Sequence, residues 1–491
     1  MAATGNVELT ILDGGAGVVN VPATTVQVVI GTCSSGTAAA VVASRNANTL
    51  ATAVGYGPSV DAAAIAIAAG ATVLHMKAAT ATPGAASAVT AFATGTSVVT
   101  VTGAPYDAYL VKMYVANGGT IGTTGIRIKI SLDAGRTYGP EISIGTAVTY
   151  AITGTNLTLA FAAGTMVTGE SVTFGCTEPL AATAGISACL TALQASPYAV
   201  TGWGSMHILG PWTGANATTI QGYLTTLETG KIYTRAIIAA RDNALPTAYG
   251  GAGETDAVWA AAIALDYSAV SAKRVCACAG YYNMQSQFPV SAAGAPILRR
   301  PLSFALAARQ VTIPAQRLAS RVRDGSLQQI VVDPTNDPSD GFNYHDEFNA
   351  PALDVARFTA ARRRFGLPGF YISNPFLMSA SGSVFNLLPK GVVMDIGSTL
   401  LNQLGTDNIN DDIPLNTNGT IDEIAAQSIE STIRNSMNEA MLNTGMLSAP
   451  GVVVAVDRTN NVRTTEHVNI AATLYGKGYV RQINATIGFA S

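Results

Sequence analysis

Ser205-Met-His-Ile-Leu209 is the first of three short β-forming runs that are separated by two helical stretches. Gly230 closes the first helical stretch, as glycine often does at the end of a helix. A chain that alternates strands and helices in this way folds into a parallel sheet with helices on both faces. The sequence therefore predicts a three-layer α/β region, with strands at residues 205–209, 234–239 and 274–279 and helices at residues 217–229 and 252–267.

The same alternation is present on either side of this region. Near the N-terminus, residues 26–30 and 71–77 are predicted strands, and residues 59–69 form a predicted Ala/Ile-rich helix between them. Further along the chain we predict a helix over residues 302–319, interrupted by Pro314, a helix over residues 353–365 and a strand over residues 369–373.

The chain changes character at about residue 78. Residues 78–94 have a linker composition of Ala, Thr, Gly and Pro, and residues 95–178 contain seven β-forming runs separated by Gly or Asn-Gly. Short strands at this spacing are typical of a β-sandwich or barrel. We predict that residues 95–178 form an inserted all-β domain that faces outward. Within it, Ser131-Leu-Asp133-Ala-Gly135-Arg-Thr137 resembles the Asp-box of sialidases, in which Ser and Asp side chains bond the backbone of a tight hairpin. A structural turn is preferred here over sugar binding.

The C-terminal part begins with Thr420-Ile-Asp-Glu423, which matches a capping box and predicts the start of a helix. Gly445 is predicted to end that helix, and strands are predicted at residues 451–457 and 465–475. Residues 479–491 alternate with period two and form a last strand with no later element to cover its edge. The residues on one face of that strand are Tyr479, Arg481, Ile483, Ala485, Ile487 and Phe489.

Composition limits the classes of protein that fit. Charged residues make up 12% and hydrophobic residues 48% of the 491 residues, which excludes a charge-solvated disordered chain. The net charge of −3 does not favour nucleic-acid binding by the chain as a whole. No run of about 20 apolar residues occurs, and the N-terminus lacks the pattern of a signal peptide, so neither membrane insertion nor a secretory signal is expected. With so little charge, either the surface is rich in Thr, Asn and Gly, or much of it is covered in an assembly.

Residues that could perform chemistry do not form a recognisable set. The four histidines, His75, His207, His345 and His467, are far apart, and neither a phosphate-binding loop nor a nucleophile elbow occurs. The five cysteines, Cys33, Cys176, Cys189, Cys276 and Cys278, lack the spacing of a zinc site, and buried free thiols are expected. We therefore predict no catalytic residues, no cofactor and no metal.

Charge is distributed unevenly along the chain. Residues 299–323 contain six Arg and no acidic residue, whereas residues 395–439 contain eight acidic residues and only Arg434 as a basic one. Two solvated faces are one interpretation, complementary surfaces on neighbouring copies or on another partner are a second, and nucleic-acid binding is the least favoured. The residues predicted to carry interface charge are Arg299, Arg300, Arg309, Arg317, Arg321, Arg323, Asp411, Asp412, Asp422 and Glu423.

Several short motifs resemble contractile tail sheath proteins of myophages. At the N-terminal side they are Val29-Ile-Gly31, Ser35-Gly-Thr37, Val54-Gly-Tyr-Gly57 and residues 70–77. At the C-terminal side they are Met441-Leu-Asn-Thr-Gly-Met-Leu447 and Asp457-Arg-Thr-Asn460. Leu367-Pro-Gly-Phe-Tyr-Ile-Ser-Asn374 and Leu388-Pro-Lys-Gly-Val-Val-Met-Asp395 are similar to the sheaths of Mu-like phages, a family related to R-type pyocin and type VI secretion sheaths. The resemblance covers both ends and the middle α/β region but leaves out residues 95–178.

This resemblance implies a mechanical role and no enzymatic activity. Sheath subunits form hexameric rings that stack helically around a tail tube, and contraction drives the tube through the host envelope for genome ejection. The implied partners are further copies of the chain, the tail tube protein, and baseplate and tail terminator proteins. The implied location is the tail of a virion that assembles in the bacterial cytoplasm.

The expected fold class is a multidomain α/β and α+β protein: a discontinuous α/β sheath core with an inserted all-β domain and extended terminal β arms. The N-terminal arm is made pliable by Gly14, Gly15 and Gly17, and the arms are expected to link neighbouring subunits. The expected parts are a linking arm (1–20), an N-terminal core part (21–94), the inserted domain (95–178), a middle domain (179–375), a C-terminal domain on the inner face (376–478) and a linking strand (479–491).

Two other functions fit parts of the sequence. Another structural protein of a virion or surface lattice, such as a capsid protein or an adhesin, would share the low charge and the missing catalytic set. An α/β hydrolase with an accessory β domain would need a nucleophile, a base and a group that orients the base. Such a set cannot be assembled from the sequence.

Overall fold

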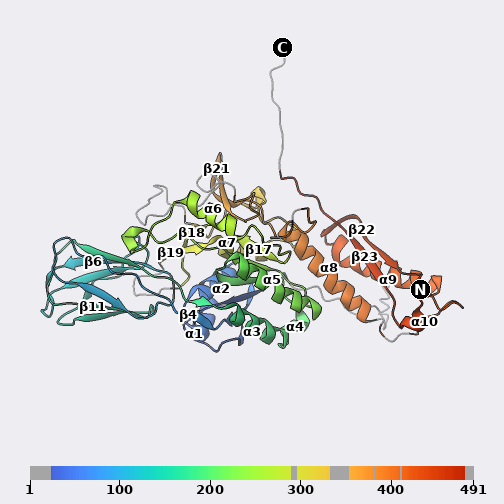
Figure 1. Ribbon diagram of the computed structural model, residues 1–491, viewed down its shortest axis with the longest axis horizontal. Coiled ribbons are helices and arrows are strands. Elements are labelled where there is room, and N and C mark those ends of the chain that lie inside the picture. The colour runs from blue at the N-terminus through green and yellow to red at the C-terminus, as the bar shows by residue number, and fades with distance from the viewer. Residues whose placement is uncertain are drawn as a thin grey trace, which may run out of the picture. The chain divides into compact units, whose positions relative to one another are not determined.

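The computed structural model describes residues 24–288, 296–331, 353–380, 382–407, 409 and 412–481. The chain divides into two compact units. The main unit is Ala23–Val392, and the C-terminal unit is Val393–Ser491 together with Met1–Pro22. Figure 1 shows the elements of both units, and each unit is described by itself below.

A six-stranded sheet lies at the centre of the main unit, in the order β17-β16-β15-β1-β3-β2. Five strands are parallel and only β2 is antiparallel. This confirms the α/β alternation expected from the sequence. The strands are β1 (Val26–Gly31), β2 (Val41–Ser44), β3 (Thr72–Lys77), β15 (Ser205–Pro211), β16 (Ala236–Ala239) and β17 (Val275–Cys278).

Helices cover both faces of this sheet. Helices α2 (Pro58–Ala68) and α7 (Leu302–Thr312) pack on one face, with α1 (Ala47–Val54) against α2. Helices α3 (Thr183–Gln194), α5 (Gly214–Thr229) and α6 (Asp256–Asp266) share one apolar core with strand residues such as Ile30 and Ile208. Shorter helical turns are α4 (Tyr198–Thr201), η1 (Thr247–Tyr249) and η2 (Val322–Asp324).

Residues 99–175, the β region, form three small antiparallel sheets, of orders β10-β11-β5, β13-β6-β8-β9 and β12-β7. They share a separate apolar core, to which β6 contributes Val111 and Met113 and β11 contributes Leu159 and Phe161. A two-stranded stem of β4 (Thr80–Thr82) and β14 (Leu180–Ala181) joins the β region to the sheet. The strands are β5 (Val99–Thr102), β6 (Leu110–Asn117), β7 (Gly119–Thr120), β8 (Arg127–Ser131), β9 (Ile142–Ser143), β10 (Thr149–Ile152), β11 (Leu157–Phe161), β12 (Thr165–Met166) and β13 (Ser171–Gly175).

Two hairpins complete the main unit. One consists of β18 (Tyr281–Gln285) and β19 (Ile297–Pro301), and Leu298 of β19 joins the apolar core of the β region. The other consists of β20 (Ala361–Arg364) and β21 (Leu367–Ile372). The predicted helix over residues 353–365 is therefore wrong. Gly366, at φ 75°, turns the chain back so that residues 361–364 pair with β21 instead of coiling.

Helix α8 (Leu388–Thr406) leads into the C-terminal unit. There α9 (Glu423–Met437) packs on β22 (Leu447–Val456), which pairs with β23 (Ile470–Gly476). A π-helical turn, η3 (Asn438–Leu442), follows α9, and a short helix, α10 (Val462–Thr465), lies between the strands. Gly445, at φ 77°, follows the last helical turn as predicted.

The start of α9 differs from the predicted capping box. Asp422 is the N-cap residue, and its carboxylate accepts hydrogen bonds from the backbone N–H of Ile424 (2.9 Å) and Ala425 (3.4 Å). Glu423 cannot serve as the reciprocal partner of Thr420, because its carboxylate binds Arg458 and Gln427 instead. A carboxylate at the N-cap satisfies orphan N–H groups and also suits the helix dipole.

The terminal arms fall largely outside the described residues. Tyr479 and Arg481 follow β23 without regular secondary structure. The rest of the predicted strand, residues 482–491, and Gly14, Gly15 and Gly17 lie outside the described part of the chain, so the linking arms remain a prediction.

The Asp-box-like turn is a folding device, as the sequence suggested. Ser131 Oγ accepts the N–H of Gly135 (2.8 Å), and Asp133 accepts the N–H (2.8 Å) and the hydroxyl (2.6 Å) of Thr137. Asp133 Oδ2 also accepts the N–H of Ile297 at 3.0 Å. One buried carboxylate therefore closes the turn and attaches the β region to β19.

We expect Asp133→Ala to lower the free energy of unfolding by about 1.5–3 kcal/mol, because hydrogen bonds to a buried charged group are lost. Denaturant unfolding followed by circular dichroism measures this change. The matched control is Glu141→Ala, whose partners Arg127 and Lys129 are exposed on the same sheet, and it should cost less than about 1 kcal/mol. Equal losses for the two variants would contradict the anchoring role of Asp133.

Candidate functional site at the carboxyl edge of the sheet

The strand order reverses between β1 and β15, because the chain first adds β3 on one side of β1 and later adds β15 on the other. In open α/β sheets, the crevice beyond the carboxyl ends of such strands is the usual ligand site. Here the chain that returns from the β region lies over that point. Thr32 Oγ1 donates a hydrogen bond to the carbonyl of Pro179 at 3.0 Å.

Little space remains in this crevice. Thr32, Pro179, Leu209 and Gly210 help to enclose a void of about 10 Å³. That volume is about the minimum that a single water molecule needs. The crevice that is the usual ligand site of open α/β sheets is thus filled here by the protein's own chain, which joins the β region to the sheet.

Arg300 lies behind this joint, with its side chain only 2% exposed. Its Nε donates to Asp61 on α2 at 3.0 Å, and its two terminal nitrogens donate to the two carboxylate oxygens of Asp107 at 2.6 Å each. Asp107 lies just before β6, and Arg300 lies on β19. One guanidinium therefore connects three separate parts of the main unit through a bidentate and a single ion pair.

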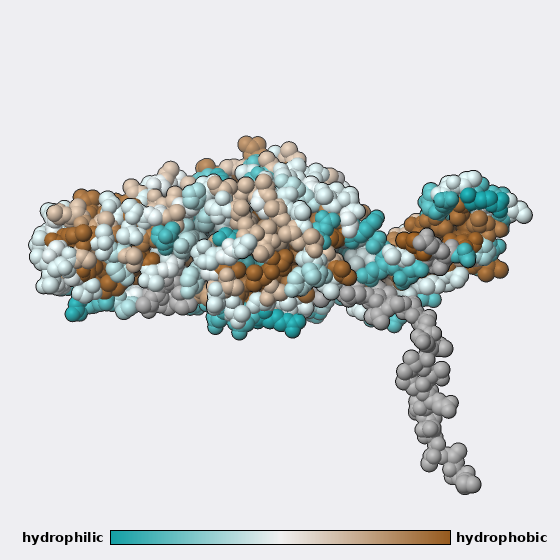
Figure 2. Space-filling view, turned by 90° about the horizontal axis from the view of Figure 1, so that it is seen from below, coloured by the Kyte–Doolittle hydropathy of each residue, from teal (hydrophilic) through white to brown (hydrophobic). Residues whose placement is uncertain are grey.

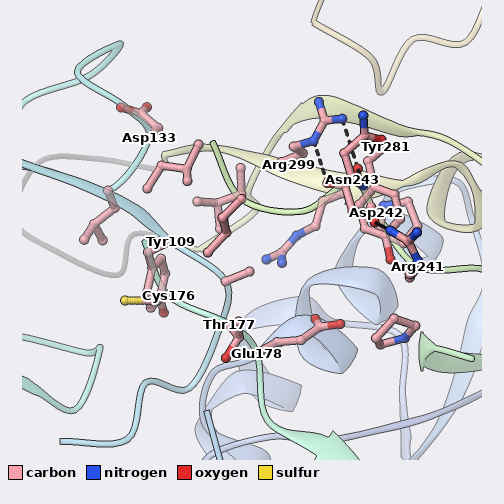
Figure 3. Close-up of a pocket in the computed structure, with 18 of the residues that line it drawn as sticks. Tyr109, Asp133, Cys176, Thr177, Glu178, Arg241, Asp242, Asn243, Tyr281 and Arg299 are labelled. Atoms are coloured by element: carbon pink, nitrogen blue, oxygen red, sulfur yellow. Dashed lines mark hydrogen bonds and ion pairs between the residues drawn. The ribbon is translucent and has the colours of Figure 1, made fainter. Parts of the chain in front are cut away.

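A larger cavity of about 380 Å³ adjoins this cluster, between the β region and the sheet. Its wall includes Tyr109, Leu132, Leu245 and Ile297. Figure 3 shows the ion pair of Arg299 and Asp242 along one side of the cavity. That pair is 2.6 Å long, and Arg241 next to it binds Glu254 at 2.7 Å, so these cations are held by carboxylates of the same chain.

Glu178 also lies in the cavity wall. It is half-buried, and Figure 3 shows it across the cavity from the pair of Arg299 and Asp242. Burial raises the pKa of Glu178 to about 7, and the nearby carboxylates of Asp107 and Asp242 add to this effect, while Arg300 opposes it. A carboxyl with this pKa changes its charge near neutral pH at the joint itself.

Two Ser–His pairs lie between the sheet and the helices α2 and α7. His75 Nε2 is 2.9 Å from Ser59 Oγ, and His207 Nε2 is 2.9 Å from Ser303 Oγ. All four residues are buried, and burial lowers the pKa of His75 to about 4 and that of His207 to about 3. Sequence reasoning missed these pairs, because only the register of the sheet and the placing of the helices bring the residues together.

The surroundings of these pairs fit a structural role. Ser59 Oγ donates to the carbonyl of Thr32 at 2.8 Å, and within the described residues His75 Nδ1 has no partner. A catalytic pair needs a group that orients the base and a path for substrate to the nucleophile. Each Nε2 atom and serine hydroxyl has a buried partner, which lowers the cost of placing these polar groups in the core.

The residues predicted to carry interface charge have separate roles in the structure. Arg299 and Arg300 bind carboxylates inside the main unit, and for the buried Arg300 the predicted interface role is wrong. Arg309 donates to the carbonyls of residues 324–326, and Arg317 and Arg321 lie within 3.3–3.6 Å of Asp324. In the C-terminal unit Asp422 caps α9, Glu423 pairs with Arg458 at 2.6 Å, Asp412 is exposed and Asp411 lies outside the described residues.

The five cysteines are buried and free, as predicted. Burial raises the pKa of Cys33 and Cys189 to about 11 and that of Cys176 to about 12, so these side chains are unreactive thiols near neutral pH. Across the described ranges, no group of three or more His, Cys, Asp or Glu is arranged to hold a metal ion. None of the helices in those ranges combines the length and the apolar character needed to cross a bilayer.

One known protein family matches most of the chain. The model of the family described as DUF2586, N-terminal domain, matches residues 4–375, which is well over half of the chain. The chain belongs to the DUF2586 family. No curated protein sequence matches it.

Several solved structures of sheath proteins are similar to this chain at low sequence identity. The sheath tail protein from Desulfitobacterium hafniense has a TM-score of 0.47 and 9% identity over 96% of this chain and 100% of that chain. The sheath tail protein from Listeria innocua has a TM-score of 0.44 and 12% identity over 92% and 94%. The sheath of the extracellular contractile injection system PVC, in its contracted state, has a TM-score of 0.40 and 10% identity over 57% and 70%.

We expect Asp107→Asn to lower the free energy of unfolding by about 3–5 kcal/mol, because it leaves part of the Arg300 charge buried without its partner. Thermal or denaturant unfolding of the full chain measures the loss. Arg127→Gln is the matched control, since it breaks an ion pair whose side chains are 58% and 41% exposed. If both variants lost the same small amount of unfolding free energy, the Arg300 cluster would not be the main link between the β region and the sheet.

We also expect Glu178→Gln to change the pH dependence of stability. The pKa of Glu178 is about 7 in the folded protein and lies near its ordinary value of 4.5 in the unfolded chain, so stability from this group is present below about pH 4.5 and is lost as the pH rises to 7. The slope is at most about 1.4 kcal/mol per pH unit. Melting curves from pH 5 to 7.5 should show this slope in the wild type and a smaller slope in Glu178→Gln. Identical slopes in the two proteins would contradict the raised pKa of Glu178.

Proposed function

We propose that this chain is the structural subunit of a contractile tail sheath. In this proposal, subunits assemble as stacked hexameric rings around a tail tube and contract to drive the tube through a host envelope. Baseplate and tail terminator proteins would bind the two ends of the sheath. The sequence motifs support the proposal, and the main observation behind it is the small two-stranded sheet of the C-terminal unit.

The decisive observation is a two-stranded sheet that is incomplete in the described part of the chain. Among the described residues, β22 and β23 pair only with each other. The inner face of β22 presents Val452, Val454 and Val456, which are buried beside α9. Within the described residues, the outer edge of β23 has no strand partner. At the outer edge of β22, the N–H groups of Val452 and Val456 donate to Asn438 Oδ1 (2.9 Å) and Glu430 Oε1 (2.8 Å).

The uncovered face is apolar and uncharged. Val453 opposes Thr473, and Ala455 opposes Ala471, on the side of the sheet away from α9. Val453 is 45% exposed and Tyr475 is 44% exposed. Figure 2 shows apolar surface with a hydrophilic rim on the C-terminal unit, at the right of the view. Apolar surface of this kind marks interaction sites in soluble proteins.

A sheet of this kind is a template for further strands. An isolated pair of strands is marginally stable, and natural edges are usually protected by charge or proline. Strand addition from a neighbour would satisfy the open main-chain groups, at a gain of about 0.5–1.5 kcal/mol for each hydrogen bond. Residues 479–491 and 1–20 of neighbouring subunits are the strands that the resemblance to sheaths suggests.

Contraction places a second requirement on the subunit, because its core must move as one body while the linking strands stay paired. The Arg300 cluster, the stem of β4 and β14, and the filled crevice together hold the β region on the sheet. These internal contacts support a rigid main unit. Many weak links between subunits can then hold the lattice together while its subunits change their orientation.

We expect Val453→Lys to prevent the assembly of cylinders while the subunit stays folded, because a charge on the uncovered face blocks burial there. The free energy of unfolding should change by less than about 0.5 kcal/mol, as for other surface substitutions. Electron microscopy of the purified protein and thermal unfolding measure the two effects. Val148→Lys is the control, since Val148 is 53% exposed in the β region.

Deletion of residues 479–491 tests the linking strand in the same assay, and it should also give a folded subunit without cylinders. Cylinders from both altered proteins would overturn the linking role. Closed shells or planar lattices from the wild type would favour another structural class, and monomers alone would overturn the assembly itself.

A further inference from the structure

A cluster of arginines surrounds the hairpin of β20 and β21. Leu327 N–H donates to the carbonyl of Phe370 at 2.8 Å, and Arg309 binds the carbonyls of residues 324–326, so the segment after α7 lies beside this hairpin. Seven Arg and only one acidic residue, Asp324, belong to these segments. We call them the basic patch, and its arginines are Arg309, Arg317, Arg321, Arg323, Arg362, Arg363 and Arg364.

The basic patch includes a large apolar side chain at its tip. Phe365, at the turn of the hairpin, is fully exposed, and Leu367 is 42% exposed. Arg363 is exposed and lies over the ring of Phe370, with its guanidinium carbon 5.8 Å from the ring centroid. Figure 1 shows the hairpin, labelled β21, projecting from the body of the main unit. An exposed aromatic side chain among arginines is typical of the centre of a protein interface.

A surface with the opposite properties exists in the C-terminal unit. Asp422 N–H donates to the carbonyl of Pro414 at 3.0 Å, so the segment near Asp412 lies beside the start of α9. Asp412 and Glu423 are exposed there, and Ile424, which follows Glu423 in the chain, is 79% exposed. We call Asp412, Asp422, Glu423 and Ile424 the acidic patch. Arg458 binds Glu423 and Glu430, which leaves a net negative charge.

The two units have opposite net charge as well. Residues 23–392 contain 22 basic and 18 acidic residues, whereas residues 393–491 contain 5 basic and 10 acidic ones. Charge complementarity therefore identifies a second copy of this chain as an occupant of the basic patch. Complementary charges steer partners together and fix their register, while the buried apolar centre supplies affinity.

We propose that the basic patch of one subunit docks on the acidic patch of a second copy, with Phe365 packed against Ile424. This inference rests on the proposed function and adds a contact that does not involve the terminal arms. The charges at the rim of such a contact are screened within about 8–10 Å at physiological salt, so the contact weakens as salt is added.

The test is a charge swap in the full-length chain. The basic reversal is Arg323→Glu with Arg363→Glu, the acidic reversal is Asp412→Arg with Glu423→Arg, and the swap combines all four. The matched control is Arg127→Glu with Lys129→Glu, which reverses two basic residues of the β region. Thermal unfolding checks that each variant folds, and sedimentation measures the protein concentration at which polymers form.

We expect each reversal to raise that concentration by about tenfold at low salt, which corresponds to about 1.4 kcal/mol, and by less at 0.5 M salt. The swap should restore assembly, and the control should not change it. Wild-type polymers that are insensitive to both reversals, or a swap that does not restore assembly, would overturn the docking while leaving the proposed function intact. A wild type that never polymerises would overturn both.

Other partners for the basic patch are distinguished with two probes. Single-stranded oligothymidylate tests for a nucleic acid, and vesicles of phosphatidylglycerol test for an anionic membrane. Binding of either probe that the basic reversal abolishes, together with unchanged polymer formation, would assign the patch to that partner and overturn docking on a second copy.

Discussion

The main unit depends on one buried guanidinium. Arg300 is held by carboxylates from α2 and from the chain before β6, and its neighbour Leu298 belongs to the apolar core of the β region. A buried charge is tolerated only where its partners are placed with good geometry, so these three parts must meet in one arrangement. The ion pairs specify how the β region sits on the sheet, and the apolar cores on each side supply most of the stability.

This arrangement also explains why the usual ligand site of an α/β sheet is closed here. The chain that returns from the β region through Pro179 lies over the crevice, and Thr32 fixes it there. A ligand-binding crevice needs an opening to solvent and unsatisfied polar groups. Here the hydroxyl of Thr32 is already bonded to the segment that connects the β region to the sheet. The carboxyl edge of the sheet therefore serves as a joint, and the wall of the adjoining cavity includes Arg299, Asp242 and Arg241, which are already held in ion pairs.

Local patterns in the sequence predicted the sheet, the strands of the β region and the Asp-box-like turn, because the periodicity of apolar residues and the turn residues determine them. The sequence could not reveal contacts between distant residues. Arg300 and Asp61 are 239 positions apart, and nothing local distinguishes Arg300 from Arg321. The predicted capping box was wrong for a related reason. The carboxylate of Glu423 binds Arg458, which lies 35 positions further along the chain. The helix predicted over residues 353–365 failed in part because the turn at Gly366 pairs residues 361–364 with β21.

The open edge of β23 has a consequence for growth. If a neighbour's strand completes this small sheet, the incoming subunit brings an identical vacant edge with it, and the growing end is regenerated at every addition. A polymer of this kind has no built-in stop, so its length must be measured by something other than the subunit. The slow event is then the formation of the first ring, and the number of nuclei decides how the available protein is divided among particles.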